Sequence, residues 1–390
     1  MIAIACAFGC LIGADEGEAL ADGRSAITGR KTMSTVLQLK NVTKAFGEMR
    51  ALDGIDLALP GDAYISLLGP SGSGKTTLLR VIAGFEDPDG GSILFDGKRI
   101  DTVAPHQRGI GFVFQNFALF PHLSVAQNIA FGLENREVDA VTDRRVVEGR
   151  VKDIIALVGL TGLEGRAVTQ ISGGQRQRVA LARTLVTEPR MVLLDEPLGA
   201  LDANLRARMR TELRAIRERC GVTFLHVTGS ETEALAMGDT VLVLDRGRIA
   251  QSADSDTIYN RPASPAVARF LNCYNLFPGR LEGGAFVGSA GRFSLGGRAA
   301  TRATQPAYAI RYDRVAVRPR EAAIGNDEVR VEGNFVASEY SGAAVNSFFT
   351  LDDGRVFEVE THLSHAAPEA YEDQGRYALV WKREDALVYA

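Results

Sequence analysis

Residues 69–76 read Gly-Pro-Ser-Gly-Ser-Gly-Lys-Thr, and this short stretch decides the fold of the segment around it. It follows an apolar run, residues 63–68, that is typical of a buried strand, and it precedes a run with helical spacing, residues 77–83. Glycines in such a strand–loop–helix unit let backbone N–H groups close around phosphate oxygens, and the helix N-terminus adds a partial positive charge. The stretch therefore predicts a phosphate-binding loop for a nucleoside triphosphate.

The residues of this loop have distinct expected roles. Lys75 is expected to reach the β- and γ-phosphates, and the hydroxyl of Thr76 is expected to join the shell of a magnesium ion. The other expected nucleotide contacts in the loop are Gly69, Pro70, Ser71, Gly72, Ser73, Gly74 and Thr77. A glycine-rich turn without a ligand is the alternative interpretation, and the strand before the loop and the helix after it disfavour that alternative.

A second apolar run, residues 191–194, ends in the two acids Asp195 and Glu196. Many buried strands end in an acid, so this pattern gains weight only beside the phosphate-binding loop. Asp195 is expected to hold magnesium, and Glu196 is expected to orient or deprotonate an attacking water. The two stretches together predict that the chain binds and hydrolyses a nucleoside triphosphate.

The spacing of apolar residues predicts an α/β domain followed by an all-β domain. From about residue 35 to residue 270, short apolar runs alternate with helical periodicity, which is typical of a P-loop domain around a largely parallel sheet. Few strand candidates occur between about residues 121 and 189, so we expect a helical insertion there. Beyond it, turn signals separate short runs, which predicts a small β domain of OB-like type over residues 275–390, with a hairpin at residues 348–360.

Composition and charge exclude several classes of protein. The 390 residues carry 44 basic and 48 acidic side chains, a formal net charge of −4, which argues against reliance on the phosphate backbone of nucleic acid. The longest apolar run, residues 1–14, is shorter than the roughly 20 residues of a membrane-spanning helix. It also lacks the positively charged start of a secretory signal, and the four cysteines are scattered, which favours the cytosol. We expect residues 1–34 to be an N-terminal extension, either disordered or an artefact of the start site, with Met33 as the alternative start.

One further motif makes the prediction specific. Residues 171–175, Ile-Ser-Gly-Gly-Gln, can open a helix that Ser172 caps, and they resemble the signature motif of the ATP-binding-cassette (ABC) ATPases. The resemblance covers nearly all of residues 36–390. It implies that the nucleotide is ATP, and that Ser172, Gly173, Gly174 and Gln175 face the γ-phosphate held by a second subunit.

Three other features fit the same family. Gln115 resembles the glutamine of the family's Q-loop, which implies contacts with magnesium and the attacking water and a position beside a membrane partner. Residues 199–202, Gly-Ala-Leu-Asp, resemble the family's D-loop, which implies a nucleotide contact for Asp202. Phe46 stands where the family stacks an aromatic ring on adenine.

For two other stretches, an ordinary structural interpretation stands beside or replaces a functional one. An apolar group follows Gln115 in a stretch that the family exposes to its membrane partner, and core packing is an equally weighted alternative; the group consists of Phe117, Leu119, Phe120 and Leu123. The charged run at residues 206–210 predicts a solvated helix face.

The resemblance also implies an assembly. Two copies form a homodimer that sandwiches two ATP molecules and drives two membrane-spanning permease subunits, while a periplasmic or extracellular solute-binding protein acts indirectly. The subunit is then peripheral, on the cytoplasmic face of the inner (plasma) membrane. Residues 316–319 and 339–342 resemble the regulatory β domain of polyamine, ferric-iron and phosphonate importers. No nucleic-acid partner is expected, because relatives that act on nucleic acid or ribosomes commonly carry two fused cassettes or long coiled-coil insertions.

The chain departs from the family at one position. The family usually carries a switch histidine where this chain has Gly229, and glycine has no side chain to contact the γ-phosphate or the attacking water. His226 lies three residues earlier on a predicted strand, so its side chain is expected on the opposite face. Either Glu196 sustains a working, slower ATPase in which Ser230 or water partly fills the gap, or the chain is an ATP-binding regulatory module with little turnover. The presence of Glu196, Lys75 and Ser172 favours the first alternative.

Overall fold

The computed structural model describes residues 35–135, 140–199, 201–295, 301, 303, 305–364 and 370–390. From residue 35 to residue 390, the described residues belong to one compact unit, so the domain boundary predicted between residues 270 and 275 stays a prediction. The predicted N-terminal extension, residues 1–34, lies outside the described residues. Within the part of the chain that is described, no helix combines the length and the apolar character needed to span a membrane.

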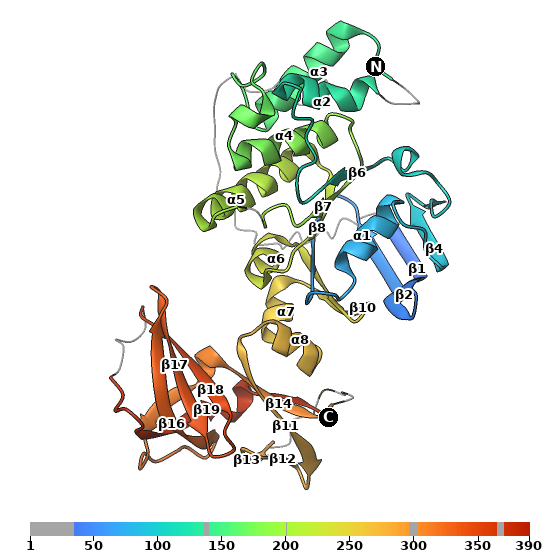
Figure 1. Ribbon diagram of the computed structural model, residues 1–390. Helices are drawn as coiled ribbons and strands as arrows, with labels where there is room; N and C mark the ends of the chain where they lie inside the picture. The colour runs from blue at the N-terminus through green and yellow to red at the C-terminus, as the bar shows by residue number, and fades with distance from the viewer. Residues whose placement is uncertain are drawn as a thin grey trace, which may run out of the picture. The chain divides into compact units, whose positions relative to one another are not determined.

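A six-stranded sheet forms the centre of the α/β part (Figure 1). Its order is β10-β9-β3-β8-β7-β6, and all neighbours are parallel except the β10–β9 pair. The strands are β3 (Tyr64–Leu68), β6 (Ile110–Val113), β7 (Met191–Asp195), β8 (Thr223–Val227), β9 (Thr240–Asp245) and β10 (Arg248–Ala253). The predicted α/β fold with a largely parallel sheet is therefore confirmed for these strands.

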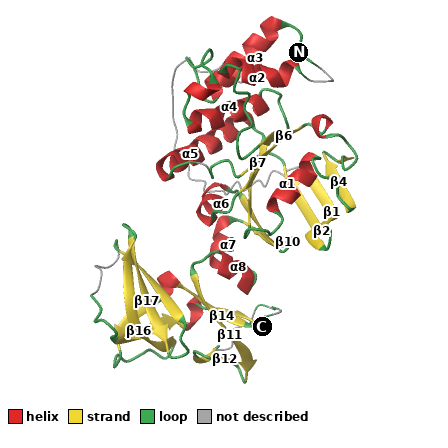
Figure 2. Cartoon of the chain, viewed as in Figure 1, coloured by secondary structure: helices red, strands yellow, loops and turns green. Residues whose placement is uncertain are grey.

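Helices cover both faces of this sheet, as Figure 2 shows. The helices of the α/β part are α1 (Lys75–Ala83), α2 (Val125–Glu134), α3 (Arg144–Leu157), α4 (Gly173–Leu185), α5 (Ala203–Cys220), α6 (Glu231–Met237), α7 (Ser255–Asn260) and α8 (Pro265–Phe270), of which α2 and α3 pack on α4. In β7, Met191 and Leu193 pack in the cluster that contains α1, whereas Val192 and Leu194 pack in the cluster that contains α2 to α5. Because β7 is buried on both faces, its sequence is an unbroken apolar run.

A second sheet lies against α1 and extends the predicted α/β architecture. It is antiparallel, with order β2-β1-β4-β5, and consists of β1 (Thr35–Phe46), β2 (Met49–Pro60), β4 (Gly90–Phe95) and β5 (Lys98–Arg99). The alternation of apolar runs with helical periodicity does not distinguish these strands from those of the parallel sheet. The signal is the period-two burial of β2, in which Ile55, Leu57 and Leu59 face the core and the residues between them are exposed.

The C-terminal part is all-β, as predicted, and consists of two five-stranded antiparallel sheets. One has the order β13-β12-β11-β14-β20, with β11 (Tyr274–Glu282), β12 (Ala285–Gly288), β13 (Gly291–Ser294), β14 (Ala307–Arg311) and β20 (Leu387–Tyr389). The other has the order β15-β19-β16-β17-β18, with β15 (Ala316–Pro319), β16 (Glu328–Tyr340), β17 (Ala344–Leu351), β18 (Val356–His362) and β19 (Arg376–Lys382). The predicted hairpin is the β17–β18 pair, and Gly354 supplies a φ of 81° in its turn.

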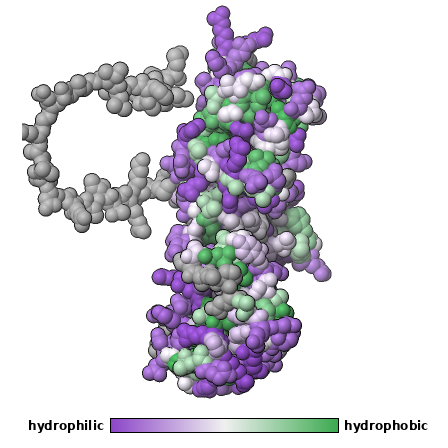
Figure 3. Space-filling model, turned by 90° about the vertical axis from the view of Figure 1, so that its left-hand side faces the viewer, coloured by the Kyte–Doolittle hydropathy of each residue, from purple (hydrophilic) through white to green (hydrophobic). Residues whose placement is uncertain are grey.

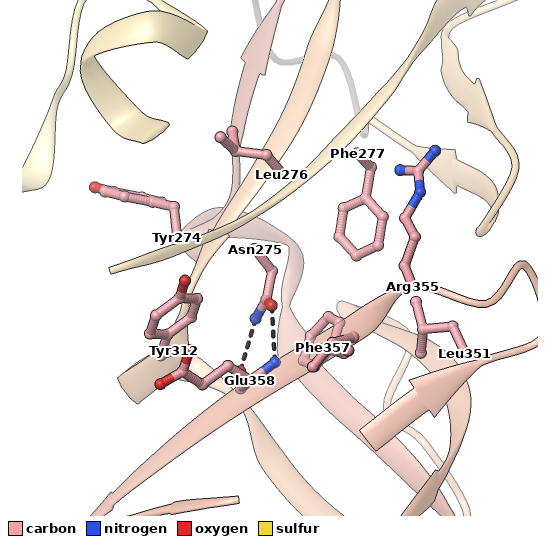
Figure 4. A pocket seen from close by; sticks show the side chains of 10 residues that line it. Tyr274, Asn275, Leu276, Phe277, Tyr312, Leu351, Arg355, Phe357 and Glu358 are labelled. Carbon is pink, nitrogen blue, oxygen red and sulfur yellow. Dashed lines mark hydrogen bonds between the residues drawn. The ribbon is translucent and has the colours of Figure 1, made fainter. Parts of the chain in front are cut away.

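An asparagine clasp closes the seam between these two sheets (Figure 4). Asn275 of β11 is 7% exposed; its Nδ2 donates to the Glu358 carbonyl at 2.7 Å, and its Oδ1 accepts from the Glu358 N–H at 2.9 Å. A pocket of about 260 Å³ opens beside the clasp. One charged side chain that lines it already has a partner, since Arg355 pairs with Asp353 at 3.2 Å. We interpret the pocket as a packing seam.

The clasp predicts a specific loss of stability. Asn275→Ala leaves the Glu358 N–H and C=O without these partners, so we expect the free energy of unfolding of the C-terminal part to fall by about 1–3 kcal/mol. Trp381, the single tryptophan, is 2% exposed in this part, and its fluorescence during urea unfolding measures the change. Asn326→Ala, at an exposed position, is the control and should change the free energy by less than about 0.5 kcal/mol. Equal effects of the two substitutions would contradict the proposed role of the clasp.

Candidate functional site

The phosphate-binding loop runs from the end of β3 to the start of α1. Gly72 and Gly74 adopt φ values of 77° and 103°, which glycine tolerates best. A Cβ atom at Gly74 would lie 2.3 Å from the Ala51 carbonyl oxygen, and one at Gly69 would lie 2.2 Å from the Leu244 carbonyl oxygen. The loop therefore requires glycine at both positions. No side chain caps the N-terminus of α1, which leaves its first N–H groups facing the loop.

Lys75 lies inside this loop. Its Nζ donates to the carbonyl oxygens of Gly69 at 2.7 Å and Pro70 at 2.9 Å. Burial lowers the pKa of its ammonium, while the nearby carboxylates of Glu196 and Asp195 act in the opposite direction. The Oγ of Ser73, a residue that is 3% exposed, is buried without a hydrogen-bond partner. The loop thus holds a cation and an unpaired hydroxyl, which suits an anionic ligand.

The two predicted acids follow β7. Burial, together with the Glu196 carboxylate, raises the pKa of Asp195, and a hydrogen bond with Thr76 is one of the interactions that oppose the rise. Glu196 adopts a φ of 44°, uncommon for a residue other than glycine, and its N–H donates to the Val227 carbonyl at 3.0 Å. The turn therefore lies directly beside the end of β8.

Gln115 follows β6, the neighbour of β7. Its Nε2 donates to Glu196 Oε2 at 3.1 Å. Parallel neighbours end at the same edge of a sheet, and this alignment brings together two residues that are far apart in sequence. The structure therefore gathers Lys75, Thr76, Asp195, Glu196 and Gln115 at one edge.

Oxygen atoms dominate this edge. The Asp195 carboxylate, the Thr76 hydroxyl and the Gln115 amide oxygen are hard donors of the kind that magnesium prefers. No group of three or more His, Cys, Asp or Glu side chains suited to a metal occurs among the described residues. Magnesium that is held by one carboxylate, a hydroxyl and nucleotide phosphates needs no such group, so the residues present fit this ion.

The remaining predicted contacts lie on other elements. Phe46 ends β1 and is 45% exposed, with Lys44 Nζ 5.4 Å from the centre of its ring. Thr77 belongs to the first turn of α1. Ser172 caps α4, because its Oγ accepts from the Gln175 N–H at 3.3 Å while Gln175 Oε1 accepts from the Ser172 N–H at 2.8 Å.

Two sets of predicted nucleotide contacts, Ser172–Gln175 and Asp202, lie at the starts of α4 and α5. Among the described residues, they form no bond with the sheet edge that carries Lys75. Asp202 caps α5, and its Oδ1 accepts from the Leu205 N–H at 2.9 Å. Ala200 of the predicted D-loop lies outside the described residues. In the residues that the structure covers, no hydrogen bond or ion pair links Ser172, Gln175 or Asp202 to Lys75, Asp195 or Glu196.

Gly229 lies in the turn after β8. A Cβ atom built on it meets no atom within 4 Å, so the position has open space. His226 is fully buried in β8, its Nδ1 lies 3.1 Å from the Tyr64 hydroxyl, and burial lowers its pKa to about 3. It faces the core, as the strand period predicts, and does not replace a switch histidine. Ser230 Oγ caps α6 by accepting from the Glu233 N–H at 3.3 Å.

Sequence reasoning missed an arginine clamp beside Gln115. Phe117 and Ala118 adopt φ values of 64° and 44°. Arg183 of α4 holds their carbonyl oxygens, with Nη2 3.0 Å from that of Phe117 and Nη1 2.8 Å from that of Ala118. Phe117 is only 8% exposed, so core packing is the correct interpretation for it. The clamp ties the stretch after Gln115 to the helix that Ser172 caps.

Comparisons with known protein families agree with this geometry. The model of the ABC transporter family matches residues 52–199. The sulfate/thiosulfate import ATP-binding protein CysA of Caulobacter vibrioides is 41% identical over 330 residues, which are 85% of this chain and 94% of the relative. The spermidine/putrescine import ATP-binding protein PotA of Clostridioides difficile is 44% identical over 63% of this chain and 70% of the relative. The Fe(3+) ions import ATP-binding protein FbpC 1 of Haemophilus influenzae is 46% identical over 64% and 74%.

Solved structures agree as well. A nucleotide-free ATP-binding cassette from an ABC transporter matches with a TM-score of 0.55 and 28% identity, over 61% of this chain and 98% of that chain. The dimeric structure of a post-hydrolysis state of an ATP-binding cassette bound to ADP and phosphate matches with a TM-score of 0.50 and 30% identity, over 56% and 98%. The chain belongs to the ABC transporter family, as an ATP-binding and ATP-hydrolysing subunit of an importer.

Proposed function

We propose that two copies of this ATPase subunit sandwich two ATP·Mg²⁺ and power solute import through two membrane-spanning permease subunits. The observation that carries the proposal is the convergence of Lys75, Asp195, Glu196 and Gln115 at one edge of the parallel sheet, with Gln115 and Glu196 in direct contact at 3.1 Å. The same edge holds the phosphate-binding loop. Binding and hydrolysis of ATP therefore use residues from three separate segments.

The side chains at this edge have complementary roles in hydrolysis. The loop N–H groups and Lys75 bind the β- and γ-phosphates, and to do so Lys75 exchanges the Gly69 and Pro70 carbonyls for phosphate oxygens. Glu196 accepts a proton from the attacking water, and the amide of Gln115 orients that carboxylate. Thr76, Asp195 and Gln115 would hold magnesium, which supplies positive charge against the phosphates. Phe46 stacks on adenine.

A second copy of the chain supplies the other half of each site. Ser172, Gly173, Gly174 and Gln175 open α4 and, in the proposed dimer, face the γ-phosphate held by the loop of the other subunit, with Asp202 at the same junction. The absence of any bond from Ser172, Gln175 or Asp202 to the Lys75 edge within one chain, among the described residues, supports this arrangement. A similar ATP-binding cassette has a solved dimeric structure with ADP and phosphate bound.

An exposed aromatic group near Gln115 supports a membrane partner. Phe85 and Phe114 are 45% and 39% exposed, and their rings stack with centres 5.7 Å apart. Phe131 of α2 is 38% exposed and contacts Phe120 with ring centres 4.4 Å apart. Figure 3 shows patches of hydrophobic residues among hydrophilic ones on one face of the molecule. We propose that a permease subunit covers Phe85 and Phe114, which places the chain peripherally on the cytoplasmic face of the membrane.

The solute is expected to be a small charged molecule. The relatives are named for spermidine/putrescine, for sulfate/thiosulfate and for Fe(3+) ions, which share charge and small size. Nothing in these relatives favours the alternative of a non-hydrolysing regulatory module. In the proposed importer the permease subunits and an external solute-binding protein select the solute.

The first prediction for the nucleotide site concerns binding. Gly74→Ala forces a side chain to within 2.3 Å of the Ala51 carbonyl oxygen in a backbone that disfavours it, so we expect ATP affinity to fall at least about 100-fold. Titration with a fluorescent ATP analogue measures the affinity. Gly97→Ala is the matched control, because Gly97 has a similar φ of 76° with open space around it and lies outside the loop. Unchanged affinity in Gly74→Ala would contradict the assigned loop.

The second prediction concerns hydrolysis. Glu196→Gln keeps the size of the side chain but removes its basicity, so we expect kcat for ATP to fall by about 10²- to 10⁴-fold while ATP still binds. Phosphate release by the purified full-length chain in the presence of Mg²⁺ measures the rate, and chelation by EDTA should abolish it. If the unsubstituted chain is no faster than Glu196→Gln, it is a binding module and the hydrolytic role is wrong.

The third prediction concerns the missing histidine. The open space at Gly229 can receive an imidazole, so we expect Gly229→His to raise kcat by about 10-fold, equivalent to about 1.4 kcal/mol of barrier. The same assay applies. Gly149→His is the control, since Gly149 is exposed on α3 and a Cβ atom there also meets no neighbour. A rate that stays at the level of the control would mean that Gly229 does not limit hydrolysis.

A further inference from the structure

A buried glutamate lies next to the turn that carries Gly229. Glu233 of α6 is 5% exposed, and its Oε2 accepts a hydrogen bond from the Thr228 hydroxyl at 2.7 Å. Its other oxygen, Oε1, lies 3.5 Å from Nε of Arg206 on α5. Burying a carboxylate is costly unless it is paired and hydrogen-bonded, so both contacts are needed to keep Glu233 where it is.

On one side, this carboxylate fixes the turn around Gly229. The Thr228 hydroxyl that donates to Glu233 also accepts the Ser230 N–H at 3.0 Å. The Thr228 N–H donates to the Leu67 carbonyl of β3 at 3.1 Å. Thr228 and Ser230 flank Gly229, so the backbone on both sides of the glycine is held by one hydrogen-bonded group.

On the other side, the same carboxylate reaches the segment that begins α5. Arg206 donates through Nη2 to the Leu201 carbonyl at 2.9 Å, and its backbone N–H donates to the Asp202 carbonyl at 2.8 Å. Asp202 is the residue that we place at the junction with the second subunit. A continuous set of contacts therefore runs from Asp202 through Arg206, Glu233 and Thr228 to the turn at Gly229.

We propose that Glu233 is a positioning residue for ATP hydrolysis, which fixes the Gly229 turn through Thr228 and ties it to the start of α5 through Arg206. The inference rests on the proposed function, because it assumes that the turn faces the attacking water. Glycine has the largest backbone freedom of any residue, and Gly229 has no side chain that could pack. The order of this turn therefore depends on its neighbours, and the contact with Glu233 supplies it.

The test compares substitutions in this group within the purified full-length chain. Thr228→Val keeps the shape of the side chain and removes the hydroxyl, and Glu233→Gln keeps the size and removes the charge that faces Arg206. We expect each to lower kcat for ATP by about 5- to 10-fold and to leave KM for ATP within about two-fold, because the phosphate-binding loop is a separate segment. Thr228→Ser, which retains the hydroxyl, should restore most of the kcat that Thr228→Val loses.

Two further readouts separate positioning from a merely structural role. Thr228→Val added to Gly229→His should remove the gain in kcat that the histidine gives, because an imidazole on an unfixed turn is not aimed at the water. Thr228→Val combined with Glu233→Gln should lower kcat no further than the stronger single substitution, because both interrupt the same set of contacts between Arg206 and the Gly229 turn. Thermal unfolding of every variant records its stability in parallel.

The outcomes are distinguishable. A lower unfolding midpoint with unchanged kcat in Thr228→Val and Glu233→Gln overturns the inference, since the group would then serve stability alone. Equal kcat for Thr228→Ser and Thr228→Val also overturns it. If kcat of the parent chain is no higher than that of Glu196→Gln, the proposed hydrolytic function itself fails and the inference falls with it. If the parent chain and the variants Thr228→Val and Glu233→Gln all hydrolyse ATP at the same high rate, only the inference fails.

Discussion

The parallel alignment of β6, β7, β8 and β3 is the constraint on which the rest of the site depends. Because these strands end at one edge, the turns that follow them meet there, and the turns after β3, β6 and β7 bring the functional groups. The β3 turn carries the phosphate-binding loop, the β7 turn carries Asp195 and Glu196, and the β6 turn carries Gln115. The antiparallel sheet and α1 cover one face of the same strands, and the 2.3 Å between a Cβ atom built on Gly74 and the Ala51 carbonyl oxygen shows how closely β2 supports the loop.

The sequence predicts the parts of this site whose chemistry is local. The loop at residues 69–76 and the acids after β7 are recognisable because their function requires fixed residue types at fixed spacing. The cap made by Ser172 and Gln175 follows equally from a local pattern. The contact between Gln115 and Glu196 depends on which strands are neighbours, and no short-range spacing encodes the order of strands in a sheet.

The features that sequence analysis missed are mostly long-range or buried. Arg206 belongs to a run that predicts a solvated helix face, yet it pairs with the buried carboxylate of Glu233. Arg183 is one of several arginines in α4, and only the fold reveals that it clamps two left-handed residues. Helical periodicity assigns a charged residue to a face, but it does not identify the partner that another element brings to that face.

Gly229 contributes no side chain to the chemistry of the site, although its position has room for one. The neighbouring groups remain in place, since Ser230 caps α6 and Thr228 is hydrogen-bonded on both sides. The space that a larger side chain would fill is still open, because no atom lies within 4 Å of a Cβ atom built on Gly229. A turn that had adapted to glycine would be expected to collapse into that space or to adopt a positive φ, and this turn does neither. Position 229 therefore lacks a side chain but has room for one, and in the proposed mechanism Glu196 with Gln115 orients the water.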